Sequence, residues 1–149
     1  MKSGFEPQDA NFESRVRENF TRQRVMHLIG AELTTVEPGL VEIAIPVRED
    51  LTQQDGFVHA GILTTILDSA CGYAAFTLMP ANSSVLSVEF KVNLLAPATG
   101  DLIRAHAAVK RFGRTLTVCT ADAFADGQIC ATMLATMICR MNGAKLNKN

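Results

Sequence analysis

A dense apolar segment near the middle of the chain constrains the fold more than any other feature of the sequence. Residues 60–78 contain no proline and are apolar on nearly every face of a helix, which is typical of a buried helix. His59 stands at the start of this segment, and Asp68 is the one carboxylate inside it. A chain that buries such a helix must surround it with a sheet or with other helices.

The second half of the chain is predicted to form four antiparallel strands. The first covers residues 84–95, the next two end near Arg111 and Phe124, and the last covers residues 129–141. In the first strand, alternation places two sets of residues on opposite faces: Leu86, Val88, Phe90, Val92 and Leu94 on one, and Ser87, Glu89, Lys91 and Asn93 on the other.

The N-terminal part is predicted to form a helix and a hairpin. Residues 10–29 have the apolar spacing of an amphipathic helix, with Asp9 as a cap and Gly30 at its exit. Residues 31–36 and 40–47 flank a Glu-Pro-Gly turn and read as two strands. The order of elements predicts an α+β fold.

The chain is expected to be a single domain, residues 1–149, with loose tails at residues 1–9 and 142–149. One helix against one sheet leaves the outer face or an edge of the sheet uncovered. We therefore expect a homodimer.

Composition restricts the class of function. Of the 149 residues 48% are hydrophobic and 19% are charged, and the net charge is −1. Such a chain has enough apolar residues for a core and no general attraction to nucleic acid or anionic membranes. It lacks a signal-peptide core and a run of 18 apolar residues, so we expect a cytoplasmic protein with no membrane segment.

Metal and nucleotide chemistry have little support in the sequence. The cysteines and histidines are widely spaced: Cys71, Cys119, Cys130 and Cys139, and His27, His59 and His106. We expect reduced, packed cysteines and no metal site. The chain has no GxSxG, Walker-type or GxGxxG pattern.

The loop before the apolar segment carries a recognisable pattern. Gln53-x-x-Gly56-x-Val58-His59-Ala60-Gly61, followed by Asp68, resembles the signature of the PaaI-like (phenylacetate-degradation) hotdog-fold thioesterases. The usual form there is Asn-x-x-Gly-x-x-His-Gly-Gly, with the acid seven residues after the second glycine. The stretches LSVEFKVNLLAPATGD and KRFGRTLTV resemble a later strand and hairpin of the family, so the resemblance covers about residues 24–140. It implies a hotdog fold, in which an antiparallel sheet of about five to six strands wraps a long central helix, with an N-terminal helix beside it.

The resemblance also implies acyl-CoA thioesterase activity. Asp68 would be the general base, or the nucleophile, that directs water at the thioester carbonyl. From the residues alone, Asp68 could instead bond the hydroxyls of Thr64 and Thr65. The free N–H groups at a helix start favour negative charge, so the amide of Ala60 or Gly61 could receive the carbonyl oxygen. Gly61 could also serve only for tight helix–sheet packing.

Three further side chains are assigned by the same resemblance. His59 would orient the thioester or the loop, Gln53 would bind the carbonyl or position the loop, and Ser87 would help to hold the water. Each of these side chains could instead have a purely structural role: His59 as a helix cap, Gln53 as a solvated loop amide and Ser87 as an ordinary strand serine. In the family the site spans the dimer interface, so Asp68 and Ser87 would meet Gln53, His59 and Ala60 of a partner subunit.

This chain departs from the family pattern at two positions. Gln53 replaces the usual Asn, and Ala60 replaces the first glycine, where a Cβ has a cost if the backbone must adopt positive φ. CoA phosphates require local cations, and Lys110, Arg111 and Arg114 of the second hairpin could supply them, unless they only solvate its tip.

The expected function is hydrolysis of an acyl-CoA by a homodimer, two of which pair into a tetramer, with no cofactor besides the CoA of the substrate. Two alternatives remain at this point: a hotdog hydratase or dehydratase, and a non-catalytic acyl-CoA-binding module. The hydratase signature, with Asp and Asn-Pro before a His, is not seen.

Overall fold

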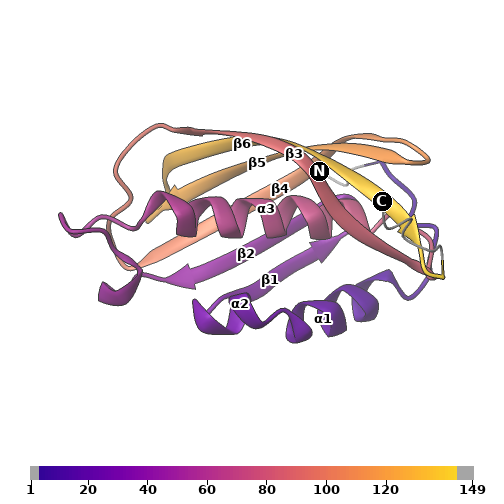
Figure 1. The fold of residues 1–149 in the computed structure, drawn as a ribbon, viewed down its shortest axis with the longest axis horizontal. Helices are drawn as coiled ribbons and strands as arrows, with labels where there is room; N and C mark the ends of the chain where they lie inside the picture. The colour runs from indigo at the N-terminus through magenta and orange to yellow at the C-terminus, as the bar shows by residue number, and fades with distance from the viewer. Residues whose placement is uncertain (1–3, 144–149) are drawn as a thin grey trace, which may run out of the picture.

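A long helix lies along the inner face of a curved antiparallel sheet (Figure 1). The computed structural model describes residues 4–143. The elements are, in order, α1 (Phe12–Arg22), α2 (Arg24–Leu28), β1 (Glu32–Glu37), β2 (Leu40–Pro46), a 3-10 turn (Glu49–Leu51), α3 (Ala60–Phe76), β3 (Ser83–Leu94), β4 (Leu102–Phe112), β5 (Leu116–Ala125) and β6 (Gln128–Met141). The six strands are ordered β1-β2-β4-β5-β6-β3, so β3 returns to the far edge beside β6. This is the predicted α+β hotdog architecture.

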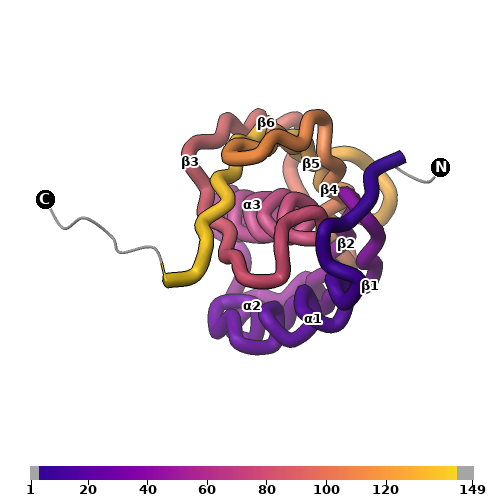
Figure 2. The backbone as a smooth tube through the Cα atoms, turned by 90° about the vertical axis from the view of Figure 1, so that its right-hand side faces the viewer, coloured from indigo at the N-terminus to yellow at the C-terminus, as the bar shows by residue number. Residues whose placement is uncertain are grey.

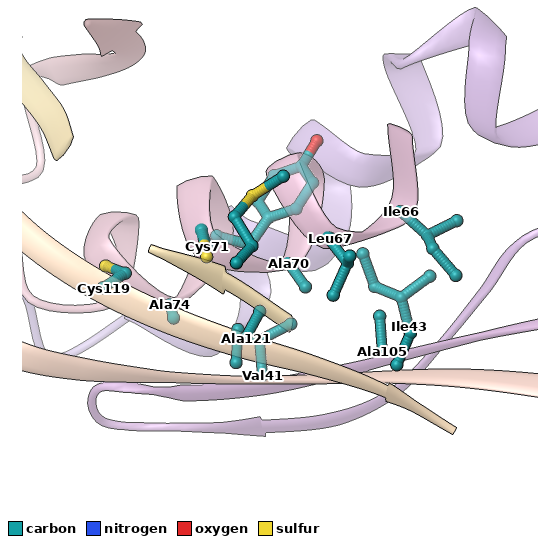
Figure 3. Close-up of a cluster of buried hydrophobic side chains, with 14 of the residues drawn as sticks. Val41, Ile43, Ile66, Leu67, Ala70, Cys71, Ala74, Ala105, Cys119 and Ala121 are labelled. Atoms are coloured by element: carbon teal, nitrogen blue, oxygen red, sulfur yellow. The ribbon is translucent and has the colours of Figure 1, made fainter. Parts of the chain in front are cut away.

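The core forms between α3 and the inner face of the sheet. Figure 2, an end-on view, shows α3 enclosed by the sheet on one side and by α1 and α2 on the other. Small residues dominate the inner face of the central strands, among them Ala105 of β4 and Ala121 of β5, which are fully or almost fully buried. Figure 3 shows them facing Ala70 and Ala74 of α3. Small side chains on both surfaces let the helix lie close to the sheet.

The predicted single helix at 10–29 is wrong in one respect, because it breaks at Gln23. There the backbone is extended (φ −81°, ψ 97°), and α1 ends where α2 begins. The break is stabilised from α3: the Gln23 amide nitrogen donates to Ser69 Oγ at 3.2 Å, and its amide oxygen accepts from Tyr73 at 3.0 Å. Side-chain hydrogen bonds to α3 therefore hold the one residue at which the helix breaks.

The N-terminal residues differ from the expected loose tail and cap. Phe5 packs against the core, and the Gln8 N–H donates to the Leu78 carbonyl at 3.4 Å. Asn11 is the N-cap of α1, whereas Asp9 accepts the Asn11 N–H at 2.9 Å and pairs with Arg15 at 3.0 Å. Burial of Phe5 and pairing of Asp9 thus fix residues 5–9. Of the other expected tail, residues 144–149 lie outside the described residues.

A β-bulge in β3 corrects the predicted assignment of its faces. The register with β6 shifts between Ser87 and Glu89, which leaves Val88 as the extra residue. Residues paired across two strands lie on the same face. Ser87 pairs with buried Met137 and so faces α3, whereas Leu86 pairs with Ile138 on the outer face. Simple alternation groups Leu86 with Phe90 on one face and places Ser87 on the other, whereas the pairing places Ser87 on the face of Phe90.

Within residues 4–143, none of the helices is both long enough and apolar enough to cross a membrane. Three of the four cysteines, Cys71, Cys119 and Cys130, are buried packing residues as predicted. Burial raises the pKa of the Cys119 thiol to about 12 and raises that of Cys71 still further.

Candidate active site

Asp68 lies in the middle of α3 and is half-buried. The hydroxyl of Ser87, on the edge strand β3, donates a hydrogen bond to Asp68 Oδ1 at 2.7 Å. Thr64 and Thr65 instead donate to backbone carbonyls one turn back, those of Ala60 and Gly61, at 2.9 and 2.8 Å. The local-hydroxyl explanation of Asp68 is therefore wrong, and its hydroxyl partner comes from another element.

The Asp68–Ser87 pair opens onto a pocket of about 450 Å³ between α3, β3 and the N-terminal helices. The bulge in β3 is what makes the pair possible, because it turns Ser87 toward α3. Ten residues line the pocket: Asn19, Arg22, Gln23, Asp68, Ser69, Gly72, Tyr73, Val85, Leu86 and Ser87. The cavity thus holds a carboxylate, a hydroxyl hydrogen-bonded to it and room for a ligand.

Polar side chains from α1 and α3 form the wall opposite β3. The Tyr73 hydroxyl lies 3.2 Å from Asn19 Oδ1 and 3.0 Å from Gln23 Oε1, both of which can accept its proton. Burial raises the pKa of Tyr73 to about 12, with the nearby Arg22 opposing the shift, so the phenol is neutral and acts as a donor. We did not identify Asn19, Gln23 or Tyr73 from the sequence. Each reads there as an ordinary residue of an amphipathic or buried helix.

His59 caps the start of α3. Its Nδ1 accepts the N–H of Gly61 at 2.8 Å, so a neutral His59 ring carries its proton on Nε2. A Cβ on Gly61 would lie 3.1 Å from that Nδ1, and no sheet residue is this close. Gly61 therefore accommodates the cap, and the alternative of tight helix–sheet packing is wrong.

The cap leaves Ala60 as the available donor at this helix end. Within residues 4–143, the Ala60 N–H has no hydrogen-bond acceptor, whereas the Gly61 N–H is occupied. Among those residues only Asp126 combines a side chain with positive φ, so Ala60 has no such backbone strain from its Cβ. Alanine in place of the family glycine at position 60 therefore keeps the backbone N–H available as a donor.

Gln53 organises the loop before α3. Its side-chain oxygen accepts the N–H of Asp55, and its backbone N–H donates to the Phe57 carbonyl at 2.8 Å. Gln53 and Ala60 line a second pocket of about 370 Å³ together with Leu94, Leu95 and other residues of the loops around them. No residue lines both pockets.

The two halves of the predicted site do not meet within one protomer. Asp68 lies eight positions after Ala60 in α3, a rise of about 12 Å along the helix. Asp68 lines the first pocket, whereas Ala60 lines the second. The chain alone therefore holds two half-sites.

The basic hairpin lies away from the Asp68–Ser87 pair and lines neither of the two pockets. Phe112, at the end of β4, aligns with Thr117, Met137 and Ser87 across four strands, so three strand spacings separate it from Ser87 by roughly 14 Å. Arg111 pairs with Val118 and therefore points to the opposite face from buried Thr117. Arg114 lies in the exposed turn. Arg22, at the pocket, is a cation closer to Asp68 that we did not single out from the sequence.

Comparison with known proteins supports the resemblance. A family model described as the thioesterase superfamily matches residues 55–132. The crystal structure of a thioesterase family protein from Silicibacter pomeroyi superposes with a TM-score of 0.85 at 51% identity, covering 88% of this chain and 99% of that one. The PaaI protein of E. coli has the same fold, with a TM-score of 0.80 at 15% identity over 88% of this chain and 94% of its own. A 1,4-dihydroxy-2-naphthoyl-CoA hydrolase from Listeria monocytogenes is 27% identical over 90 residues, 60% of this chain and 73% of that protein.

The wrapped central helix and these relatives define the class: a hotdog-fold thioester hydrolase. The chain belongs to the thioesterase superfamily.

Proposed function

We propose that a homodimer of this chain hydrolyses acyl-CoA thioesters, with Asp68 as the general base for the attacking water. The observation that carries the proposal is the 2.7 Å hydrogen bond from Ser87 to Asp68 Oδ1 in a pocket of about 450 Å³. Ser87 fixes the carboxylate by one oxygen, and the other oxygen can accept from water. A fixed carboxylate at a pocket wall is a suitable base.

The second subunit would supply the oxyanion donor. Within residues 4–143 the Ala60 N–H is an open donor at the positive end of the helix dipole, and Ala60 lines a different pocket from Asp68 of the same chain. Water attacks the carbonyl carbon while Asp68 takes its proton, and the oxyanion is received by Ala60 of the partner subunit. The C–S bond then breaks, and the CoA thiolate regains a proton from Asp68.

The edge strand β3 supports dimerisation. Within residues 4–143 its backbone is unpaired on one side. Four of its apolar side chains are between 42% and 55% exposed: Leu86, Val88, Phe90 and Leu94. Exposed apolar edges are rare in monomers unless another chain covers them. We propose that two β3 edges pair, that two such dimers form a tetramer, and that the protein acts in the cytoplasm, where buried thiols such as Cys71 stay reduced.

Two sets of cations could hold the CoA phosphates: Arg22 at the pocket, and Lys110, Arg111 and Arg114 on the hairpin. The test compares each acyl-CoA with the same acyl group on N-acetylcysteamine, in Arg22→Ala and in Arg111→Ala/Arg114→Ala. The variant that removes a phosphate contact raises KM for the CoA ester alone. Equal effects on both esters would place the contact elsewhere.

Thiol release from a panel of acyl-CoAs tests the function itself. The panel spans short, medium and long chains and aryl esters, the last because the Listeria relative is named for an aryl-CoA. Hydrolysis liberates free CoA. A hydratase adds water to an enoyl-CoA without liberating CoA, and a binding module does neither, so either of those results would overturn the proposal.

A further inference from the structure

Gly72 stands inside α3, where glycine is a poor choice. It destabilises a helix interior relative to alanine, because the flexible backbone loses more entropy on folding. Other glycines of this chain have a visible reason: Gly30 has φ +70°, and a Cβ on Gly100 would collide with the Asp126 carboxylate. A Cβ built on Gly72 would meet no atom of residues 4–143 within 4 Å, and the backbone of Gly72 is helical. Neither packing within the chain nor backbone geometry accounts for this glycine.

The space beside Gly72 belongs to the pocket of Asp68. Residues four apart lie on the same face of a helix, so Gly72 is the next position along α3 on the Asp68 face. Both residues line the cavity of about 450 Å³. The volume that a side chain at position 72 would occupy is therefore cavity volume, one turn from the carboxylate.

We propose that Gly72 is a specificity-determining residue that keeps open the subsite for the acyl group. This inference rests on the proposed thioesterase function, because it places the reacting carbonyl at Asp68. The acyl group extends from there along α3, over the backbone of residue 72. A side chain at that position would take the space that the first few carbons of the acyl group need.

The wall beside Gly72 is polar, and its polar groups are bonded to one another. Ser69 and Tyr73 are only 7% and 5% exposed, and they hydrogen-bond with Gln23 across the cavity. Because these groups already bond one another, an apolar acyl group can lie against them without leaving a buried polar group unpaired. The subsite can therefore accept an alkyl chain or a ring that extends past Asp68 to residue 72.

The test measures selectivity in Gly72→Ala and Gly72→Ser with acetyl-CoA, hexanoyl-CoA and benzoyl-CoA as substrates. We expect the ratio of kcat/KM for hexanoyl-CoA or benzoyl-CoA to that for acetyl-CoA to fall about tenfold or more in Gly72→Ala, as is typical for one methyl group in a pocket, and further in Gly72→Ser. Ser14→Thr is the matched control, because it adds one methyl group on the exposed side of α1, outside the pocket and away from β3, and it should leave the ratio unchanged. Thermal unfolding of Gly72→Ala should shift upward, since alanine favours the helix.

Three results would overturn the inference. One is an unchanged ratio in both variants. Another is an equal fall in kcat/KM for acetyl-CoA and for the larger esters. The third is a lower Tm with loss of the dimer by light scattering, which would mean that a partner chain fills the space at Gly72. If the wild-type protein releases CoA from no thioester, the proposed function fails; if it is active and the ratio is unaltered, only the role of Gly72 fails.

Discussion

Arg15 of α1 joins the N-terminal helix to the end of α3, and its replacement should destabilise the protein strongly. Its guanidinium donates to the carbonyls of Pro80 at 2.6 Å, Phe76 at 3.0 Å and Met79 at 2.8 Å. Its Nε lies 3.0 Å from Asp9 Oδ2, and its Cζ lies 4.2 Å from the centre of the Phe76 ring. A cation at this helix end also complements the dipole of α3.

The magnitude follows from the burial of these partners. The Arg15 side chain is 16% exposed and that of Asp9 9%. Removal of one partner from a buried ion pair costs about 3–5 kcal/mol, and each carbonyl left without a donor adds to the loss unless water reaches it. We expect Arg15→Ala to lose about 3–5 kcal/mol of unfolding free energy, and Tm to fall by roughly 6–20 °C for a chain of this size.

Urea and thermal unfolding measure this loss of unfolding free energy. Two further variants separate the contribution of the charge from that of the hydrogen bonds. Arg15→Lys keeps the charge but not the planar fork of donors, so it should recover only part of the stability. Asp9→Asn keeps an oxygen for the Asn11 N–H and removes only the charge. If Arg15→Ala folds poorly, hydrogen exchange is measured on Arg15→Lys instead. Relative to wild type, amide protection in that variant should fall more in α1 than in β5. A Tm for Arg15→Ala within about 2 °C of wild type would refute the reasoning.

Four further predictions concern the site and the core. Ser87→Ala should lower kcat by roughly 10- to 100-fold with the dimer intact, because a hydrogen bond to a charged group contributes about 1.5–3 kcal/mol; an unchanged rate would make Ser87 an ordinary strand serine. His59→Ala should lose about 1 kcal/mol of unfolding free energy as a lost helix cap, and His59→Asn should restore part of it in the same urea titration. Ala60→Gly should leave kcat unchanged or raise it, and a clear fall in a well-folded variant would show dependence on the methyl group. Burial raises the pKa of Cys119 from 9.0 to about 12, so the unfolded chain loses that proton first; unfolding free energy should be steady below pH 9 and decline between pH 9 and 12, less steeply in Cys71→Ala/Cys119→Ala.

The central helix and its carboxylate were predictable because their signals are local. A proline-free apolar stretch with one acid predicts a buried helix that carries a carboxylate, and α3 begins at Ala60 as predicted. The strand boundaries also follow from alternation and turn residues, to within about two residues for β3 and β6.

The Asp68–Ser87 pair was not derivable from alternation. A bulge adds one residue to a strand without changing its composition, so the faces of Leu86 and Ser87 could not be read from the sequence. Only the family pattern singled out Ser87. The break at Gln23 has the same origin, because its cause lies on another helix, in Ser69 and Tyr73. Local propensity favours continuous helix there, and tertiary hydrogen bonds override it.

The proposed hydrolysis depends most directly on the chemistry of Asp68, and one comparison of variants tests that chemistry. CoA release from the best substrate of the panel is measured for wild type, Asp68→Asn and the matched control Asp122→Asn, which changes a carboxylate on the opposite face of the sheet. Asparagine keeps the volume and can still accept from Ser87, so Asp68→Asn should retain the dimer and the Tm while kcat falls by roughly 10²–10⁴-fold, the range for a positioned base. Asp122→Asn should match wild type. A well-folded Asp68→Asn that releases CoA at the wild-type rate would contradict the account.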